Sequence, residues 1–144
     1  MDRLNIISWN VRGLGDKNCC KVRSIFRQQL RKFVVGRIDI LLIQEHHLNE
    51  QRIQKYGNMM TGKWRQFWVP AIGDNCLKAG LCIALNDNWL GFFLHYGVLT
   101  CGQVQYVILQ IGLKKWGLMN IYAPNHARDR AILWKNILSQ VPSV

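Results

Sequence analysis

Apolar runs of strand length alternate along the chain with segments whose apolar residues have helical spacing. The runs at 4–10 and 38–44 are nearly continuous, which is typical of strands packed on both faces. Between them, apolar positions three and four residues apart predict a helix that begins at Asp16 or Asn18 and ends at about Val35. The first part of the chain therefore predicts a strand, a helix and a second strand.

After residue 48 the pattern favours β-structure. We expect Asn49 to cap a short helix that reaches about Tyr56 and ends at Gly57. Arg128–Gln140 predicts a last helix with Ile132, Leu133, Ile137 and Leu138 on one face. The strands expected between these helices are 66–69, 80–85, 91–95, 104–111 and 118–122, with 112–117 as a hairpin connection. The fold class predicted from this order is α/β (α+β), a mixed sheet structure covered by helices.

Composition limits the class of protein. The chain has 144 residues, of which 49% are hydrophobic, so we expect one domain at most with a packed core. No apolar run approaches the roughly 20 residues that cross a membrane. The first residues, Met1 to Asn5, contain no apolar leader segment. These features predict an intracellular protein, nuclear or cytoplasmic, without a membrane partner.

The chain is strongly basic. Nineteen Lys and Arg against eight Asp and Glu give a net charge of +11. Such an excess favours a polyanionic partner, with nucleic acid first and an anionic membrane surface second. Arg23, Arg27 and Arg31 are spaced to form a basic stripe on the first predicted helix. A basic surface that serves solubility alone is the alternative.

The five cysteines stand at 19, 20, 76, 82 and 101, an odd number without a Cys-x-x-Cys pair. This pattern disfavours both a zinc site and a disulfide framework. We expect the cysteines to be reduced and in most cases partly buried.

Polar residues with amide, carboxylate or hydroxyl groups stand at the ends of three predicted strands. Asn10, Glu45 and Tyr122 stand at these ends, and Asn125 follows Tyr122 after Pro124. Each has a simpler explanation alone: an Asx turn, a solvated loop carboxylate, a half-buried strand aromatic and a helix cap. Together they offer oxygen ligands for a hard cation and donors for a phosphate. Glu45, with Asn10, is therefore the predicted site for Mg²⁺ or Mn²⁺.

Three more residues near these ends are candidates for contacts with an anion. His46 and His47 are adjacent, so we expect one to contact phosphate and the other to be exposed. Lys78 precedes a predicted strand in the segment Lys78-Ala-Gly80 and could bring a cation to a nucleic-acid backbone. A solvated lysine in a turn is an equally good explanation.

Four segments in order resemble the endonuclease/exonuclease/phosphatase superfamily, from about Leu4 to Leu138. The nearest resemblance is to the endonuclease domain of plant LINE-type (non-LTR) retrotransposons. The segments are Ser-Trp-Asn-Val-Arg-Gly-Leu at 8–14, Ile-Gln-Glu-His-His-Leu at 43–48, Lys-Ala-Gly-Leu-Cys-Ile at 78–83 and Asn-Ile-Tyr-Ala-Pro-Asn at 120–125. The resemblance implies a four-layer α/β sandwich and Mg²⁺-dependent hydrolysis of phosphoesters. By position, Asn10 is similar to the family's first active-site Asn, Glu45 to its metal ligand, and Tyr122 and Asn125 to its phosphate-contacting pair.

The chain departs from the family after its last predicted helix. Family members continue with a strand that ends in Asp-x-Asn, whose Asp activates water, and later with Ser-Asp-His, whose His stabilises the phosphorane. Neither follows the helix that ends near Gln140. We therefore expect residues 1–144 to form a single truncated domain, the N-terminal half of the sandwich, with the rest of the polyprotein missing.

The resemblance implies an origin in an enzyme that nicks DNA to prime reverse transcription, and we expect the chain alone to be inactive. Two alternatives remain. One is another enzyme branch, an abasic-site endonuclease or a phosphoinositide phosphatase. The other is a non-catalytic, basic remnant that binds nucleic acid.

Overall fold

The computed structural model describes residues 3–14, 38–57, 64–73 and 78–141. The first of its two sheets has the strand order β1-β2-β4-β3. Strands β1 and β2 are parallel, whereas β4 is antiparallel to both of its neighbours. The bounds are Ile6–Asn10 for β1, Ile40–Gln44 for β2, Trp64–Val69 for β3 and Leu81–Asn86 for β4.

The second sheet is an antiparallel meander in the order β5-β6-β7. The chain passes to it from the first sheet through the 3₁₀ helix η1, Asp87–Phe92. A second, shorter 3₁₀ helix η2, Thr100–Gly102, joins β5 to β6. The three strands are Phe93–Leu99 for β5, Val104–Ile111 for β6 and Lys114–Ile121 for β7.

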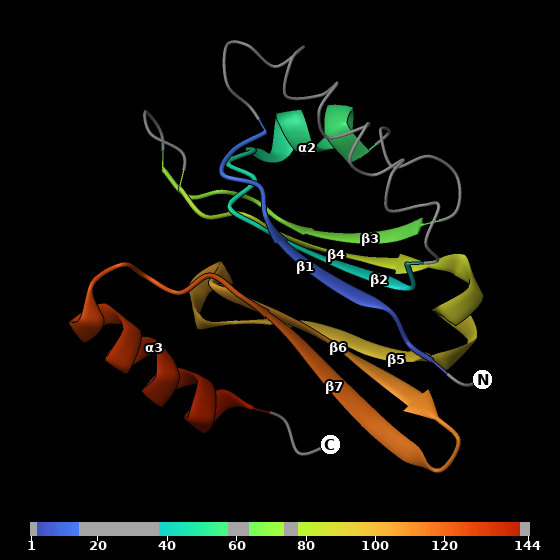
Figure 1. Ribbon diagram of the computed structural model, residues 1–144. Coiled ribbons are helices and arrows are strands. Elements are labelled where there is room, and N and C mark those ends of the chain that lie inside the picture. The colour runs from blue at the N-terminus through green and yellow to red at the C-terminus, as the bar shows by residue number, and fades with distance from the viewer. Residues whose placement is uncertain (1–2, 15–37, 58–63, 74–77, 142–144) are drawn as a thin grey trace.

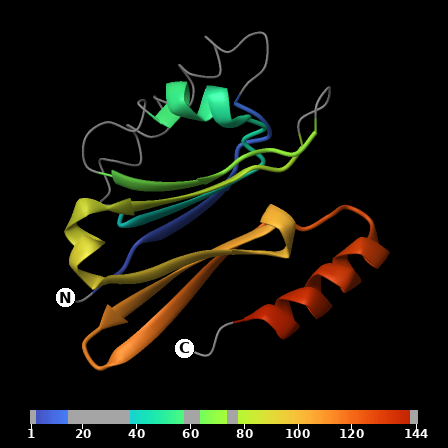
Figure 2. The same ribbon diagram turned by 180° about the vertical axis from the view of Figure 1, so that it is seen from behind.

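The two sheets lie face to face, and within the described residues one helix lies on the outer side of each (Figure 1). Helix α2, Glu50–Gly57, covers the first sheet, and helix α3, Ala127–Gln140, covers the second. The view from behind shows the same order of helix, sheet, sheet and helix (Figure 2). The predicted α/β class and the sandwich of two sheets are confirmed.

Apolar residues fill each interface between these layers. The cluster between the sheets contains Ile40 and Leu42 of β2, Ile83 and Leu85 of β4, and Val107 and Leu109 of β6, closed at one end by Trp89 of η1. A second cluster lies under α2 and includes Leu41, Ile43, Cys82 and Ala84. The alternation along β2 and β4 thus places apolar side chains on both faces, as the continuous apolar run at 38–44 predicts for β2.

Strand β1 is less buried than its sequence suggests. Ile7 and Trp9 pack into the cluster under α2, but Ile6 on the opposite face is 39% exposed. The reason is that β1 is the edge strand of its sheet, and among the described strands it pairs with β2 alone.

β5 and β7 differ most from their predicted bounds. η1 occupies Asp87–Phe92, so β5 begins at Phe93 and extends to Leu99, beyond the predicted end. β7 begins at Lys114 because Ile111 pairs with Lys114, which leaves the turn to Gly112 and Leu113. The exposed start of β7, from Lys114 to Gly117, has no apolar alternation by which a strand could be predicted.

Helix α3 uses a narrower apolar face than predicted. Leu133 and Ile137 are buried against Val104 of β6. Leu133 and Ile137 are one helical turn apart and so lie on the same side of the helix. Ile132 and Leu138 lie to either side of this line and are 52% and 82% exposed. Of the four residues expected on one face, Leu133 and Ile137 therefore form the buried face of the helix, and Ile132 and Leu138 do not.

Other predictions fall partly or wholly outside the described residues. The helix expected up to Val35, with Arg23, Arg27 and Arg31, lies there, as do three of the cysteines. Cys82 is free and buried, and burial raises the pKa of its thiol. In the described part of the chain, no helix is both long and apolar enough to cross a membrane.

Candidate functional site

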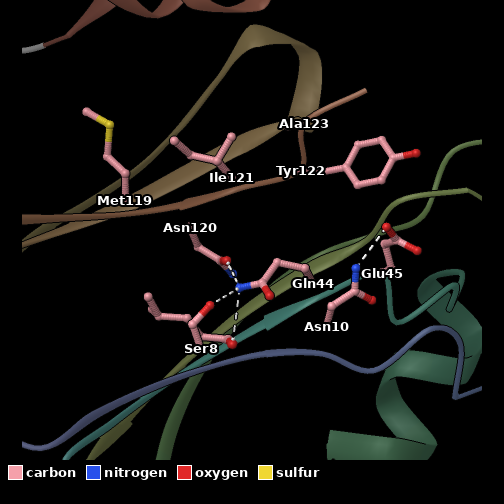
Figure 3. A pocket seen from close by; sticks show the side chains of 10 residues that line it. Ser8, Asn10, Gln44, Glu45, Met119, Asn120, Ile121, Tyr122 and Ala123 are labelled. Atoms are coloured by element: carbon pink, nitrogen blue, oxygen red, sulfur yellow. Dashed lines mark hydrogen bonds between the residues drawn. The ribbon is translucent and has the colours of Figure 1, made fainter. Parts of the chain in front are cut away.

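Three strand ends from the two sheets meet at one cleft, at the end of the sandwich opposite η1. Asn10 is the last residue of β1, Glu45 directly follows β2, and Tyr122 directly follows β7. All three line a cleft of about 420 Å³, with Ser8, Gln44 and Asn120 on the same strands (Figure 3). The Tyr122 ring and the Glu45 carboxylate lie at the same end of this cleft. Of the four predicted site residues, the structure thus brings three together.

A hydrogen bond joins Asn10 to Glu45. The Asn10 Nδ2 donates to Glu45 Oε1 at 3.0 Å, and the Asn10 Oδ1 accepts from the backbone N–H of Arg12 at 3.0 Å. A backbone N–H can only donate, so the second bond fixes which side of the amide faces Glu45. Asn10 therefore orients the carboxylate through its NH₂ group. The other Glu45 oxygen, Oε2, lies 3.8 Å from His47 Nε2.

Backbone hydrogen bonds hold the Glu45 loop on both sides. On one side, Val11 N and Gly13 N donate to the carbonyls of Gln44 and Glu45 at 3.0 and 2.7 Å. On the other side, His46 N donates to the Gly80 carbonyl at 3.3 Å. Glu45 itself has a φ of 56°, a conformation that costs a non-glycine residue about 1 kcal/mol or more. The loop is held in this conformation by neighbours that are themselves anchored to strands.

His46 is buried and has a structural role. Its Nδ1 accepts from Leu48 N at 2.9 Å, so Nε2 carries the proton and donates to the Val69 carbonyl at 2.9 Å. Burial lowers the pKa of His46 to about 4. Only His47, which is half-buried, remains near Glu45 for contact with an anion.

The buried His46 makes the stability of the protein depend on pH. The folded state binds a proton only near pH 4, whereas an unfolded histidine does so near 6.5, so stability is complete above 6.5 and falls as pH falls. We expect the free energy of unfolding to fall by about 2 kcal/mol between pH 7.5 and 5. Urea unfolding at several pH values measures this. In His46→Gln the loss over this range should be much smaller; an equal loss would contradict the assignment.

Gly80 leaves the space that the His46 ring occupies. A Cβ at Gly80 would lie 2.5 Å from His46 Cε1, and Gly80 has a φ of +93°. Position 80 therefore requires glycine for two reasons: a side chain would clash with His46, and the positive φ disfavours other residues. No feature of the sequence pairs these two residues, because the contact depends on how β2 and β4 align.

Asn125 and Lys78 lie outside the cleft. Asn125 is exposed, and its carbonyl, like that of Pro124, accepts from the guanidinium of Arg130 in α3. Lys78 is exposed and lines a second cleft of about 460 Å³ with Ile72, Gln103 and Tyr122. Tyr122 is thus the wall that the two clefts share.

The polar floor of the first cleft was not predicted. Gln44 and Asn120 point toward each other there and are hydrogen bonded, as Figure 3 shows. Behind them Gln105 of β6 is fully buried and also bonds Asn120. The available signal was a single Asn at an inward position of the predicted strand 118–122, where an apolar residue is the rule.

The donor set at the cleft is compatible with a hard divalent cation held weakly. Glu45 is the carboxylate in the cleft, and its oxygens retain lone pairs beyond the bond from Asn10. Among the residues that the structure describes, no three His, Cys, Asp or Glu side chains gather in one place. Mg²⁺ sites commonly take one or two carboxylates and complete their shell with water and substrate phosphate.

Comparison with solved structures gives the fold. The chain matches an AP endonuclease from Leishmania major with a TM-score of 0.64 at 18% identity, covering 94% of this chain and 45% of that one. It matches a 3′-5′ exonuclease from Neisseria meningitidis with a TM-score of 0.61 at 16% identity, covering 94% and 50%. It also matches the endonuclease domain of TRAS1, a telomere-specific non-LTR retrotransposon, with a TM-score of 0.54 at 17% identity, covering 96% and 55%.

These matches extend over most of this chain but only about half of each solved structure. No protein-family model and no curated protein matches the sequence. The solved structures are named as nucleases, and the chain shares their fold over most of its length. The chain therefore has the fold of the endonuclease/exonuclease/phosphatase superfamily.

Proposed function

We propose that this chain carries the metal-binding and phosphate-binding part of a Mg²⁺-dependent DNA endonuclease of the retrotransposon type. Glu45 is the metal ligand, with Asn10 beside it. Tyr122 contacts the phosphate from the cleft, and Asn125, which does not line the cleft, contacts it from beyond Tyr122. The observation that carries the proposal is the Asn10–Glu45 hydrogen bond in a cleft whose opposite side is formed by Tyr122. Similarity to the AP endonuclease and the retrotransposon endonuclease supports it.

The residues of the cleft have separate tasks in this proposal. Asn10 holds the Glu45 carboxylate toward the cleft, and the Tyr122 hydroxyl donates to a phosphate oxygen. A bound Mg²⁺ would neutralise charge that develops on the phosphate. Lys78, on the far side of Tyr122, is suited to an adjacent phosphate of the same strand.

Mn²⁺ should bind weakly and close to Glu45. A single carboxylate with water completes the shell of such an ion poorly without substrate phosphate. We expect a Mn²⁺ titration to broaden the amide NMR signals of residues around Asn10 and Glu45 first. Glu45→Gln should remove this selective broadening.

Glu50→Gln is the matched control, because Glu50 is an exposed carboxylate at the start of α2 and does not line the cleft. It should leave the broadening near Glu45 unchanged. Broadening centred on His126 and Asp129 at the start of α3 would overturn the placement of the metal.

The second candidate function is nucleic-acid binding without catalysis, which the net charge of +11 favours. We expect duplex DNA to bind with an affinity that falls steeply with salt, because each neutralised phosphate releases counterions. If Lys78 contacts a phosphate, Lys78→Gln should lower the slope of log affinity against log salt by about 1. Titration of a labelled duplex at several salt concentrations measures this.

Lys55→Gln is the control for this test, since Lys55 is an exposed lysine in α2. It removes the same charge from the outer side of the first sheet, away from both clefts. An affinity that does not change with salt would refute electrostatic binding. Two results together would favour the non-catalytic function. One is that Glu45→Gln still binds DNA, and the other is that the native chain shows no metal binding at Glu45.

A further inference from the structure

Asn120 is a buried amide at the interface between the two sheets, 1% exposed. Its Nδ2 donates to the Ile43 carbonyl at 2.8 Å and to the Cys82 carbonyl at 3.1 Å. The same NH₂ group lies 2.9 Å from Gln105 Oε1. Its Oδ1 accepts from Gln44 Nε2 at 2.6 Å. One side chain of β7 is therefore tied to β2 and β4 of the opposite sheet.

Every strand that ends at the cleft carries a member of this polar network just before its site residue. Ser8 stands two residues before Asn10, Gln44 stands one residue before Glu45, and Asn120 stands two residues before Tyr122. Gln44 Nε2 connects the other two, at 3.0 Å from Ser8 Oγ and 2.6 Å from Asn120 Oδ1. The network thus spans β1, β2 and β7 along the floor of the cleft (Figure 3).

Gln105 extends the network, because its Nε2 donates to the Phe67 carbonyl of β3 at 3.0 Å. Elsewhere the interface between the sheets is filled by apolar residues, with Val107, Leu109, Ile83 and Leu85 among them. A polar group costs free energy when it is buried, and its hydrogen bonds return only part of that cost. Apolar residues would therefore join the sheets as well. What hydrogen bonds add is a defined distance and register between the groups they connect.

We propose that Asn120, with Gln44, is a positioning residue that sets the distance between the metal-binding end of the first sheet and the phosphate-binding end of the second. The inference rests on the proposed function, because it assigns the network to the same site. A single substrate phosphate can contact both Glu45-bound metal and the Tyr122 hydroxyl only if the two sheets keep this distance. Asn120 and Gln44 act through Glu45 and Tyr122 and need not touch the substrate.

The test is the coupling between two ligands, Mn²⁺ and thymidine 5′-phosphate. In the native chain, the nucleotide should tighten Mn²⁺ binding by about tenfold, as expected when both contact one phosphate. In Asn120→Ala, Mn²⁺ alone should bind within about twofold of native, because Glu45 and Asn10 are unchanged, but the nucleotide should no longer tighten it. Mn²⁺ relaxation titrations with and without nucleotide provide both numbers.

Two further variants separate positioning from stability. Leu133→Ala destabilises the contact of α3 with β6 on the face of the second sheet that α3 covers, removes no hydrogen bond of the network, and should keep the coupling at its native value. Gln44→Leu removes the bonds to Ser8 and Asn120 from a half-buried position and should lose most of the coupling. It also serves as the test if Asn120→Ala does not fold.

The other possible outcomes refute either the positioning role of Asn120 and Gln44 or the proposed function. Native coupling in both Asn120→Ala and Gln44→Leu would refute the positioning role while leaving the metal site in place. A native chain in which Mn²⁺ binds at Glu45 without any response to nucleotide would refute the inference alone. A native chain without Mn²⁺ binding at Glu45 would refute the proposed function, and the inference with it.

Discussion

The purified 144-residue chain is expected to leave supercoiled plasmid DNA uncut in Mg²⁺. In the proposed site Glu45 holds the metal and Tyr122 contacts the phosphate, but the Asp and His that activate water and stabilise the phosphorane in the family that the chain resembles are not among the residues that line the cleft. General-base and electrostatic contributions are each worth ~10²–10⁴ in rate, and Glu45 and Asn10 are already hydrogen bonded to each other. Agarose-gel separation of nicked and supercoiled plasmid measures the activity.

Glu45→Gln and Asn10→Ala are the variants that interpret this experiment. If trace nicking occurs through a contaminating nuclease, both variants should show the same level as the native chain. Nicking that requires Mg²⁺ and disappears in both variants would prove the expectation wrong. The residues described in the cleft would then suffice for hydrolysis.

Gly80→Ala is expected to destabilise the protein by about 4 kcal/mol, which combines overpacking against a buried ring with an unfavourable backbone conformation. The new Cβ would lie within 2.8 Å of three His46 ring atoms, Cε1, Nδ1 and Nε2. The ring has no room to move, because both of its nitrogens are hydrogen bonded and it packs edge-on against Trp68 at 5.1 Å. Urea unfolding of the native and variant chains measures the difference.

Gly112→Ala is the matched control. Gly112 also has a positive φ, +62°, but a Cβ there would meet no atom within 4 Å. Its cost should be only the backbone term, about 1 kcal/mol. Equal losses in the two variants would show that the contact with His46 contributes nothing. Adding His46→Ala to Gly80→Ala should recover part of the stability, as in a double-mutant cycle of contacting residues.

The sequence was sufficient to predict the strands, helices α2 and α3, and the strand ends that meet at the cleft. A continuous apolar run identified β2, and the ends of β1, β2 and β7 place Asn10, Glu45 and Tyr122 in one cleft. Such patterns are local, and strand length and polarity are properties of a short stretch of chain. η1 escaped prediction because a 3₁₀ turn has no comparable period.

What the sequence could not reveal depends on pairing between distant segments. His46 looked like a candidate for anion contact, yet it is buried because Val69 and Gly80 lie beside it across the first sheet. Asn120 looked like part of a strand-end motif, yet its partners Ile43 and Cys82 belong to the other sheet. Neither relation has a signature within one segment.

Asn120 is far along the chain from the residues to which it is hydrogen bonded, and this distance affects the order of folding. The strands β5, β6 and β7 follow one another as hairpins, so this meander depends on contacts that are local in sequence and form fast. The bond from Asn120 to Ile43 spans 77 residues, and the bond to Cys82 spans 38. Docking of the two sheets therefore has a larger entropic cost of loop closure than formation of the β5-β6-β7 meander. In a refolding experiment, the meander should acquire its strand structure before Glu45 and Tyr122 face each other, and Mn²⁺ capture should be the last signal to appear.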